Sequence, residues 1–215
     1  MERKKDVSEF EDTVRKVEHE FGGVWIPVRF LPESLEAGAH MRFCEAVREA
    51  IRTRVVLTPE SVTCPGARRS FGWAAGLDDG LAESIAKKQR VALRTVQAMV
   101  RGSAKLREPC AAVELRTDGK PDVILSFAQP AAVTKVVRAI ESRVGGPVRQ
   151  QLSSVLSFCG NVAVRCHVSG EAAMSFGCGE SRACAGIGND RLVVGLPWPV
   201  VERLAAAPVL EEARA

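Results

Sequence analysis

Two kinds of hydrophobic pattern alternate along the chain and predict a mixture of helices and strands. Residues 8–21 place their apolar side chains at helical spacing, and Ser8 stands where a helix cap is expected. Similar helical patterns occupy 41–52, 81–100, 130–144, 159–168 and the residues that follow Pro197. Runs of β-branched and apolar residues predict strands at 24–31, 54–57, 110–116, 122–127, 174–177 and 191–196.

A motif centred on cysteine occurs twice. The sequence F-C-x-x-V begins at Phe43 and again at Phe158, and C-x-x-x-R-x-x-x-G begins at Cys64 and again at Cys178. The two pieces follow each other at nearly the same interval in both copies. This spacing predicts an internal repeat whose period is too long for a solenoid.

The order of the elements predicts an α+β fold, because strands and helices do not alternate as they do in a doubly wound sheet. With the doubled motif, we expect two similar halves, an internal pseudo-repeat, around one shared core. The predicted divisions are an N-terminal helix at 1–23, a first half at 24–121, a second half at 122–207 and a loose tail at 208–215.

Composition narrows the class of protein. With 46% hydrophobic residues among 215, the chain can bury a sizeable core. The net charge of +4 is mild, and 5% aromatic residues without Tyr are poor material for stacking on nucleic acid bases. No apolar run is long enough to span a membrane, and the charged N-terminus is unlike a signal peptide. We therefore expect a cytoplasmic protein with neither a nucleic acid nor a membrane partner, whose oligomeric state the sequence leaves open.

Several stretches resemble the prokaryotic domain of unknown function 169 family. They include Cys64-Pro65-Gly66-Ala67 and the segment 177–182, with support from 27–31, 43–48 and 190–197. The resemblance extends over about 24–204, and it implies family cysteines at Cys44, Cys64, Cys159 and Cys178. Cys110, Cys166 and Cys184 do not match that pattern, and 153–158 lacks the glycines expected before Cys159. Because the function of this family is not established, the resemblance implies positions and no reaction.

The chemistry of these cysteines predicts a metal centre. Seven cysteines are an odd number, and thiols that are reduced or bound to metal fit the chain better than a disulfide framework. Four converging thiolates can hold an iron–sulfur cluster or a tetrahedral zinc ion. We favour a [4Fe–4S] cluster as the cofactor, because proline after Cys64 and glycines around Cys178 suit loops whose amides turn toward sulfur. Zinc is the alternative cofactor. The metal ligands predicted by the doubled motif and by the resemblance are Cys44, Cys64, Cys159 and Cys178.

Two arginines follow the motif cysteines at the same distance. Arg68 and Arg182 are expected to lie around the centre and offset the negative charge of the thiolates, although Arg69 competes with Arg68 for this role. Three functions stay open: an iron–sulfur protein with a redox or cluster-dependent role, a structural zinc protein, and a metal-free thiol enzyme or module that binds an anion. The corresponding partners are a redox protein or an anionic small molecule. The ligand prediction excludes Cys110 and Cys184.

Overall fold

The fold is built on one antiparallel sheet of six strands in the order β2-β3-β1-β4-β6-β5. The computed structural model describes residues 2–145, 148, 150 and 152–207, with side chains from Phe10 onward. The strands are β1 (Ile26–Leu31), β2 (Val55–Leu57), β3 (Ala112–Leu115), β4 (Val123–Ala128), β5 (Ala173–Ser175) and β6 (Leu192–Pro197). The α+β class predicted from the sequence is confirmed.

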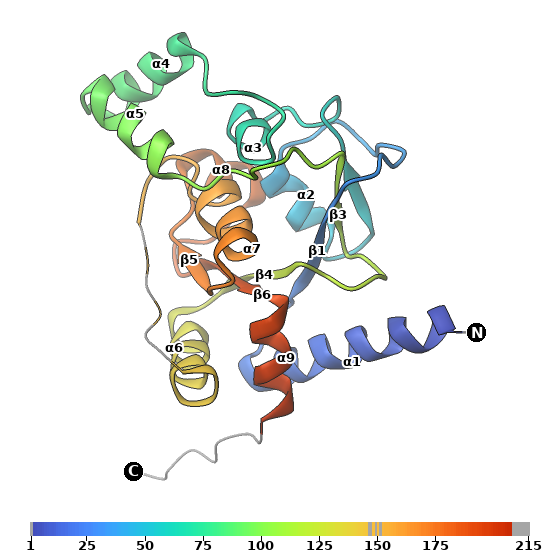
Figure 1. Cartoon of the computed structure of the whole chain (residues 1–215). Coiled ribbons are helices and arrows are strands. Elements are labelled where there is room, and N and C mark those ends of the chain that lie inside the picture. Colours follow the sequence, from blue (N-terminus) through green and yellow to red (C-terminus); the bar gives the residue numbers. More distant parts are fainter. Residues whose placement is uncertain (1, 146–147, 149, 151, 208–215) are drawn as a thin grey trace.

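Helices cover both faces of the sheet (Figure 1). One layer contains α1 (Glu2–Phe21), α6 (Pro130–Ala139) with the π-helical segment η1 (Ile140–Val144), and α9 (Trp198–Ala206). The other contains α2 (Phe43–Glu49), α3 (Pro65–Ser70), the π-helical segment η2 (Cys159–Val164), α7 (Arg165–Ser169) and α8 (Gly179–Ala185). The cysteines of the doubled motif all belong to this second layer.

The period of two along the central strands explains how one sheet holds two cores. In β4, Val123 and Leu125 pack with the helices of the cysteine layer, whereas Ile124 and Ala128 pack with α1, α6 and α9. Residues on both faces are nearly inaccessible to solvent. Such strands read as continuous apolar runs, which is why the sequence pattern located β4 well.

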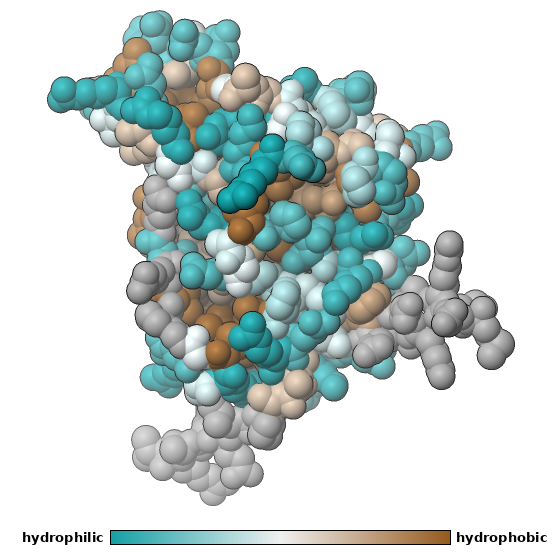
Figure 2. Space-filling view, in the orientation of Figure 1, coloured by the Kyte–Doolittle hydropathy of each residue, from teal (hydrophilic) through white to brown (hydrophobic). Residues whose placement is uncertain are grey.

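A helical hairpin projects from the cysteine side of the molecule. It consists of α4 (Asp79–Gln89) and α5 (Leu93–Gly102) and stands away from the sheet in Figure 1. Hydrophobic side chains show among the hydrophilic ones on this hairpin in Figure 2. Val96 is fully buried and joins the core of the cysteine layer.

Two sequence expectations need correction. The first helix begins at Glu2, so Ser8 lies inside it and does not cap it. The segments after Cys64 and Cys178, which the sequence predicts as turns, are the short helices α3 and α8. They are only 6 and 7 residues long, too short for a visible helical period. The tail predicted at 208–215 lies outside the described residues.

Candidate metal centre

Each of the four predicted ligands lies at the start of a helix. Cys44 is the second residue of α2, and Cys159 is the first residue of η2. Cys64 and Cys178 directly precede α3 and α8, with extended backbones at φ −88°, ψ 116° and φ −84°, ψ 164°. Backbone amides near these helix starts interact with Cys44, Cys159 and Cys178.

Aromatic packing fixes two of the cysteines. Phe43 and Phe158, which precede Cys44 and Cys159, are buried with ring centroids 5.3 Å apart. Phe71, at the end of α3, stacks edge-on against Phe43 at 5.1 Å. Such pairs add about 0.5–1.5 kcal/mol each to the stability gained by burial. The phenylalanine of F-C-x-x-V is therefore an anchor that sets the position of the next residue.

Helix packing brings the motif cysteines together in pairs. Helix α2 packs against α8, and α3 packs against η2. A Cβ atom placed on Gly66 would lie 3.7 Å from the sulfur of Cys64 and 3.8 Å from the sulfur of Cys159. These two sulfurs thus face the same point beside α3.

Electrostatic interactions connect the pairs. Burial, together with the charges of Cys64, Cys178 and Cys184, raises the pKa of Cys44 to about 12. Burial also raises the pKa of Cys159 well above its ordinary value, again with contributions from Cys64 and Cys178. Cys64 and Cys178 are thus each within electrostatic range of both buried thiols.

Several donors face these sulfurs. The amide of Ser181 donates to the sulfur of Cys178 at 3.4 Å. The backbone amides of Glu45 and Gly160 lower the pKa of Cys44 and Cys159, and the Ser70 side chain does the same for Cys159. Hydrogen bonds of this kind favour the thiolate form, which is the form that binds metal.

The four thiols are near one another without forming a finished coordination site. Within residues 10–145, 148, 150 and 152–207, no group of three or more His, Cys, Asp and Glu side chains is spaced to hold a metal ion as it stands. The donor type, the burial and the amides fit a metal–thiolate centre. To bind a metal ion or cluster, the four sulfur atoms would have to move closer together.

The guanidinium groups of Arg68 and Arg182 donate to main-chain carbonyls. Arg68 donates to the carbonyl of Pro59, and Arg182 donates to the carbonyls of Ile187 at 3.2 Å and Gly188 at 2.8 Å. Both guanidinium groups thus hold loops. Their predicted role around the centre stays a prediction.

Two other arginines interact with the thiols. Burial opposes the charge of Arg42, but Cys184, Cys64, Glu180 and Cys44 together raise the pKa of its guanidinium. Burial lowers the pKa of Arg69, and the charge of Cys159 offsets part of this effect. The sequence reasoning missed Arg42, and it considered Arg69 only as a neighbour of Arg68. The position of Arg42 directly before F-C was the available signal.

Comparison with known proteins identifies the family. The model of the domain of unknown function 169 (DUF169) family, described as uncharacterised ArCR, matches residues 14–207. The chain belongs to the DUF169 family. A relative of this DUF169 chain, the uncharacterized protein MJ0308 of Methanocaldococcus jannaschii, is 25% identical over 177 residues, which are 78% of this chain and 76% of the relative. No solved structure matches the chain.

The remaining cysteines of the DUF169 chain have other surroundings. The thiol of Cys110 points to the carbonyl of Phe71 at 3.8 Å, and burial raises its pKa to about 12. Cys166 is buried beneath Gly195, where a Cβ atom would lie 2.9 Å from its sulfur. Cys184 is half-buried on α8 and acts on Cys44, so it is a fifth thiol near the quartet. Its predicted exclusion from the ligand set stays a prediction.

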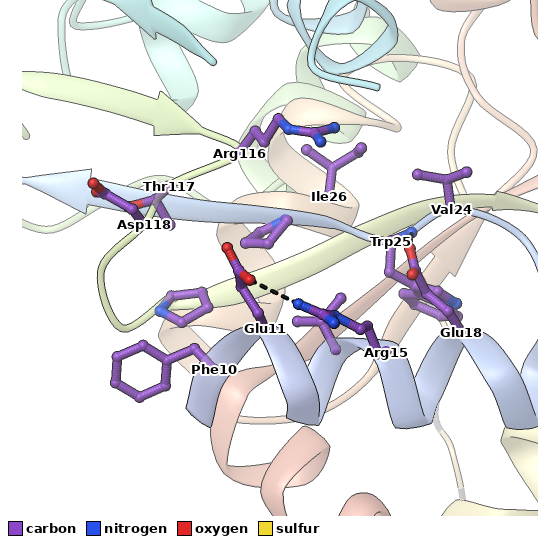
Figure 3. A pocket seen from close by; sticks show the side chains of 13 residues that line it. Phe10, Glu11, Arg15, Glu18, Val24, Trp25, Ile26, Arg116, Thr117 and Asp118 are labelled. Atoms are coloured by element: carbon purple, nitrogen blue, oxygen red, sulfur yellow. Dashed lines mark hydrogen bonds and ion pairs between the residues drawn. The ribbon is translucent and has the colours of Figure 1, made fainter. Parts of the chain in front are cut away.

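A pocket on the other face of the sheet contains none of these groups. It has a volume of about 320 Å³ and lies between α1 and the start of β1 (Figure 3). Phe10 and Trp25 line it, and Glu11 and Arg15 form an ion pair at 2.8 Å at its edge.

None of the described helices combines the length and apolarity that a membrane span requires.

Proposed function

We propose that this DUF169 protein binds a [4Fe–4S] cluster through four cysteine thiolates. The observation that carries the proposal is that the sulfurs of Cys64 and Cys159 lie 3.7 and 3.8 Å from one point beside Gly66, and the charges of Cys64 and Cys178 also raise the pKa of Cys44 and Cys159. Two thiols from each half of the chain thus face one buried region. On loading, the four side chains would turn toward a common centre and become thiolates.

Iron–sulfur binding is favoured over zinc by the backbone donors. Amides at the starts of α2, η2 and α8 act on Cys44, Cys159 and Cys178. Hydrogen bonds to sulfur stabilise the negative charge of a cluster and tune its reduction potential. When bound, the cluster supplies one-electron transfer, because four cysteine ligands leave no open position for a substrate. The partner is then a redox protein, and the compartment is the cytoplasm, where thiols stay reduced.

A structural zinc site is the second candidate. Zinc in structural sites is closed by four ligands, often all cysteines, and its binding energy contributes directly to folding. Helix α2 packs against α8, and α3 packs against η2. A zinc ion bound by all four cysteines would therefore cross-link these two pairs of helices. Metal identity therefore distinguishes this candidate from the first.

A metal-free thiol enzyme is disfavoured. A nucleophilic cysteine needs a lowered pKa, because the thiolate is the reactive form. Burial instead raises the pKa of Cys44 and Cys159. The donors of Arg182, expected to hold an anion, are directed to main-chain carbonyls.

We further propose that the protein arose as two similar halves. The strand order β2-β3-β1-β4-β6-β5 reads the same from both ends when β1, β2 and β3 are equated with β4, β5 and β6. In each half, a helix that starts near a cysteine precedes a short strand, and a second cysteine then precedes a short helix. The two cross-contacts, α2 with α8 and η2 with α3, are equivalent under the same exchange.

These matches support an approximate two-fold axis between β1 and β4, with the metal centre shared by both halves. In an experimental structure, residues 24–72 should superimpose on 122–186 with the motif cysteines in register. A superposition that aligns the strands but displaces the cysteines would contradict a common origin for the site.

Single substitutions test the ligand set. Cys44→Ser, Cys64→Ser, Cys159→Ser and Cys178→Ser should each lose most of the bound metal, since each removes a thiolate ligand. Cys110→Ser and Cys184→Ser are the matched controls and should keep it. The measurement is the metal content of each variant after anaerobic reconstitution. Loss of metal in either control would show that the predicted set of four ligands is wrong.

A further inference from the structure

Arg69 is a buried cation that lacks an acidic partner in the part of the chain that the structure describes. Only 8% of its surface is exposed, yet its Nη1 donates only to the carbonyls of Ser103 at 3.3 Å and Ala104 at 3.4 Å. Both distances are at the long end for a hydrogen bond. A buried guanidinium is normally paired with an anion, because removing its charge from water is costly.

Buried hydroxyl groups gather beside the same guanidinium. The Ser103 hydroxyl has no hydrogen-bond partner among the described residues, although the residue is only 4% exposed. A Cβ atom on Gly160 would clash with this hydroxyl and would lie 3.1 Å from the Ser70 hydroxyl. The glycine after Cys159 thus lets these groups approach the backbone at that cysteine.

More unpaired polar atoms flank Cys159 in the sequence. Ser157 Oγ and Asn161 Oδ1 are buried and without partners in the described ranges. Buried polar atoms without partners are rare in native proteins and point to an absent ion, water or ligand. Ser157 and Asn161 are neighbours of Cys159 in sequence, and the Ser103 hydroxyl lies against the backbone at Gly160.

We propose that Arg69, with the hydroxyl groups of Ser70 and Ser103, offsets the charge of the metal–thiolate centre at Cys159. The inference rests on the proposed function and deepens it. Four thiolates leave excess negative charge around either a [4Fe–4S] core or a zinc ion. Arg69 is the cation that a buried centre of this charge requires. The unpaired Ser103 hydroxyl would donate to sulfur, and the Ser70 hydroxyl would do so by leaving the Gly66 carbonyl, to which it donates at 2.8 Å. Arg69 is a positioning residue and not a ligand.

The doubled motif does not point to Arg69, because the second half has no arginine at the equivalent position. Arg68 and Arg182 occupy equivalent positions in the motif and hold loop carbonyls. Arg69 comes one residue later, and successive residues on a helix point about 100° apart, so its side chain turns inward. The position equivalent to Arg69 in the second half is Ala183, so only one half supplies the buried cation.

The test compares Arg69→Met with Arg69→Lys in metal-free and metal-loaded protein. Methionine keeps an unbranched side chain but removes the charge, so metal-free Arg69→Met should unfold at the same or a higher urea concentration than the wild type. The same variant should release metal to a chelator at least tenfold more readily, and its cluster should have a more negative reduction potential. Arg69→Lys should restore a large part of both losses.

Arg116→Met is the control. It removes a guanidinium that donates to the carbonyls of Ala50 and Ile51, so it should destabilise both forms equally and leave the reduction potential unchanged. The contrary outcome is that Arg69→Met lowers the stability of the metal-free and metal-loaded forms equally and leaves metal release unchanged. In that case Arg69 only holds the backbone at 103–104, and this inference is wrong while the proposed function still stands. If the wild type binds neither iron nor zinc, the proposed function fails and this inference with it.

Discussion

Replacing Cys44 by alanine should make the metal-free protein less sensitive to alkaline pH. In the folded protein, burial and neighbouring thiols raise the pKa of Cys44 from an ordinary 9.0 to about 12. A group with a raised pKa stabilises the fold fully below its unfolded pKa, and this stability is lost as pH rises toward the folded pKa. Above pH 9, the unfolded chain loses the proton that the folded chain keeps, so unfolding becomes more favourable.

The size of the effect follows from these two pKa values. Between about pH 8 and about pH 10, one thiol that ionises only in the unfolded state lowers the free energy of unfolding by about 1.4 kcal/mol. Only 7% of Cys44 is exposed, so screening by solvent does not reduce this figure. Cys44→Ala should therefore lose about 1.4 kcal/mol less than the wild type over this interval.

Urea unfolding under reducing, metal-free conditions at the two pH values measures this difference. Cys166→Ala is a matched control, because burial raises the pKa of Cys166 to about 12 as well, away from the proposed ligands. Both variants should show the same reduced sensitivity, whereas only Cys44→Ala should lose metal binding. An identical pH dependence in the wild type and in Cys44→Ala would mean that folding does not raise the pKa of this thiol, and the burial reasoning would be wrong.

Two further substitutions distinguish effects on the metal site from effects on the stability of the fold. Gly66→Ala should lower metal content, because the new methyl group would clash with Leu156 Cδ2 at 2.5 Å and would contact the sulfurs of Cys64 and Cys159, so side chains beside the site must shift; full metal content would show that these sulfurs do not converge on loading. Arg143→Ala should cost about 3–5 kcal/mol in urea unfolding, because it breaks a buried ion pair with Glu20 whose Nη1–Oε2 distance is 2.9 Å. Its metal content should stay unchanged, since the pair joins helices on the face opposite the cysteines, and a loss of metal would contradict that separation.

Hydrophobic periodicity was sufficient to locate the six strands and the longer helices. Strands such as β4 are apolar on both faces, and long helices such as α6 carry a clear apolar stripe. The helices after Cys64 and Cys178 were missed, since proline and glycine follow these cysteines and the same residues begin turns. Proline at the first helical position is equally favourable, and only the surrounding packing distinguishes the two cases.

The spacing of residues in the sequence pointed to the cysteines of the predicted site but not to all of the arginines near them. The doubled motif drew attention to Arg68 and Arg182, which share a spacing. Arg42 and Arg69 also interact with the thiols, and the motif did not point to them. Their approach depends on how α2 packs against α8 and α3 against η2, which is tertiary information that no local pattern contains.

Metal and sulfide analysis of the wild-type protein purified without oxygen tests the central claim most directly. The proposed function predicts a brown protein with about four iron and four sulfide per chain, and with broad visible absorbance that bleaches on reduction. One zinc per chain in a colourless protein would establish the structural zinc alternative. A protein that contains neither metal, and takes up neither on anaerobic reconstitution, would contradict a metal centre at Cys44, Cys64, Cys159 and Cys178.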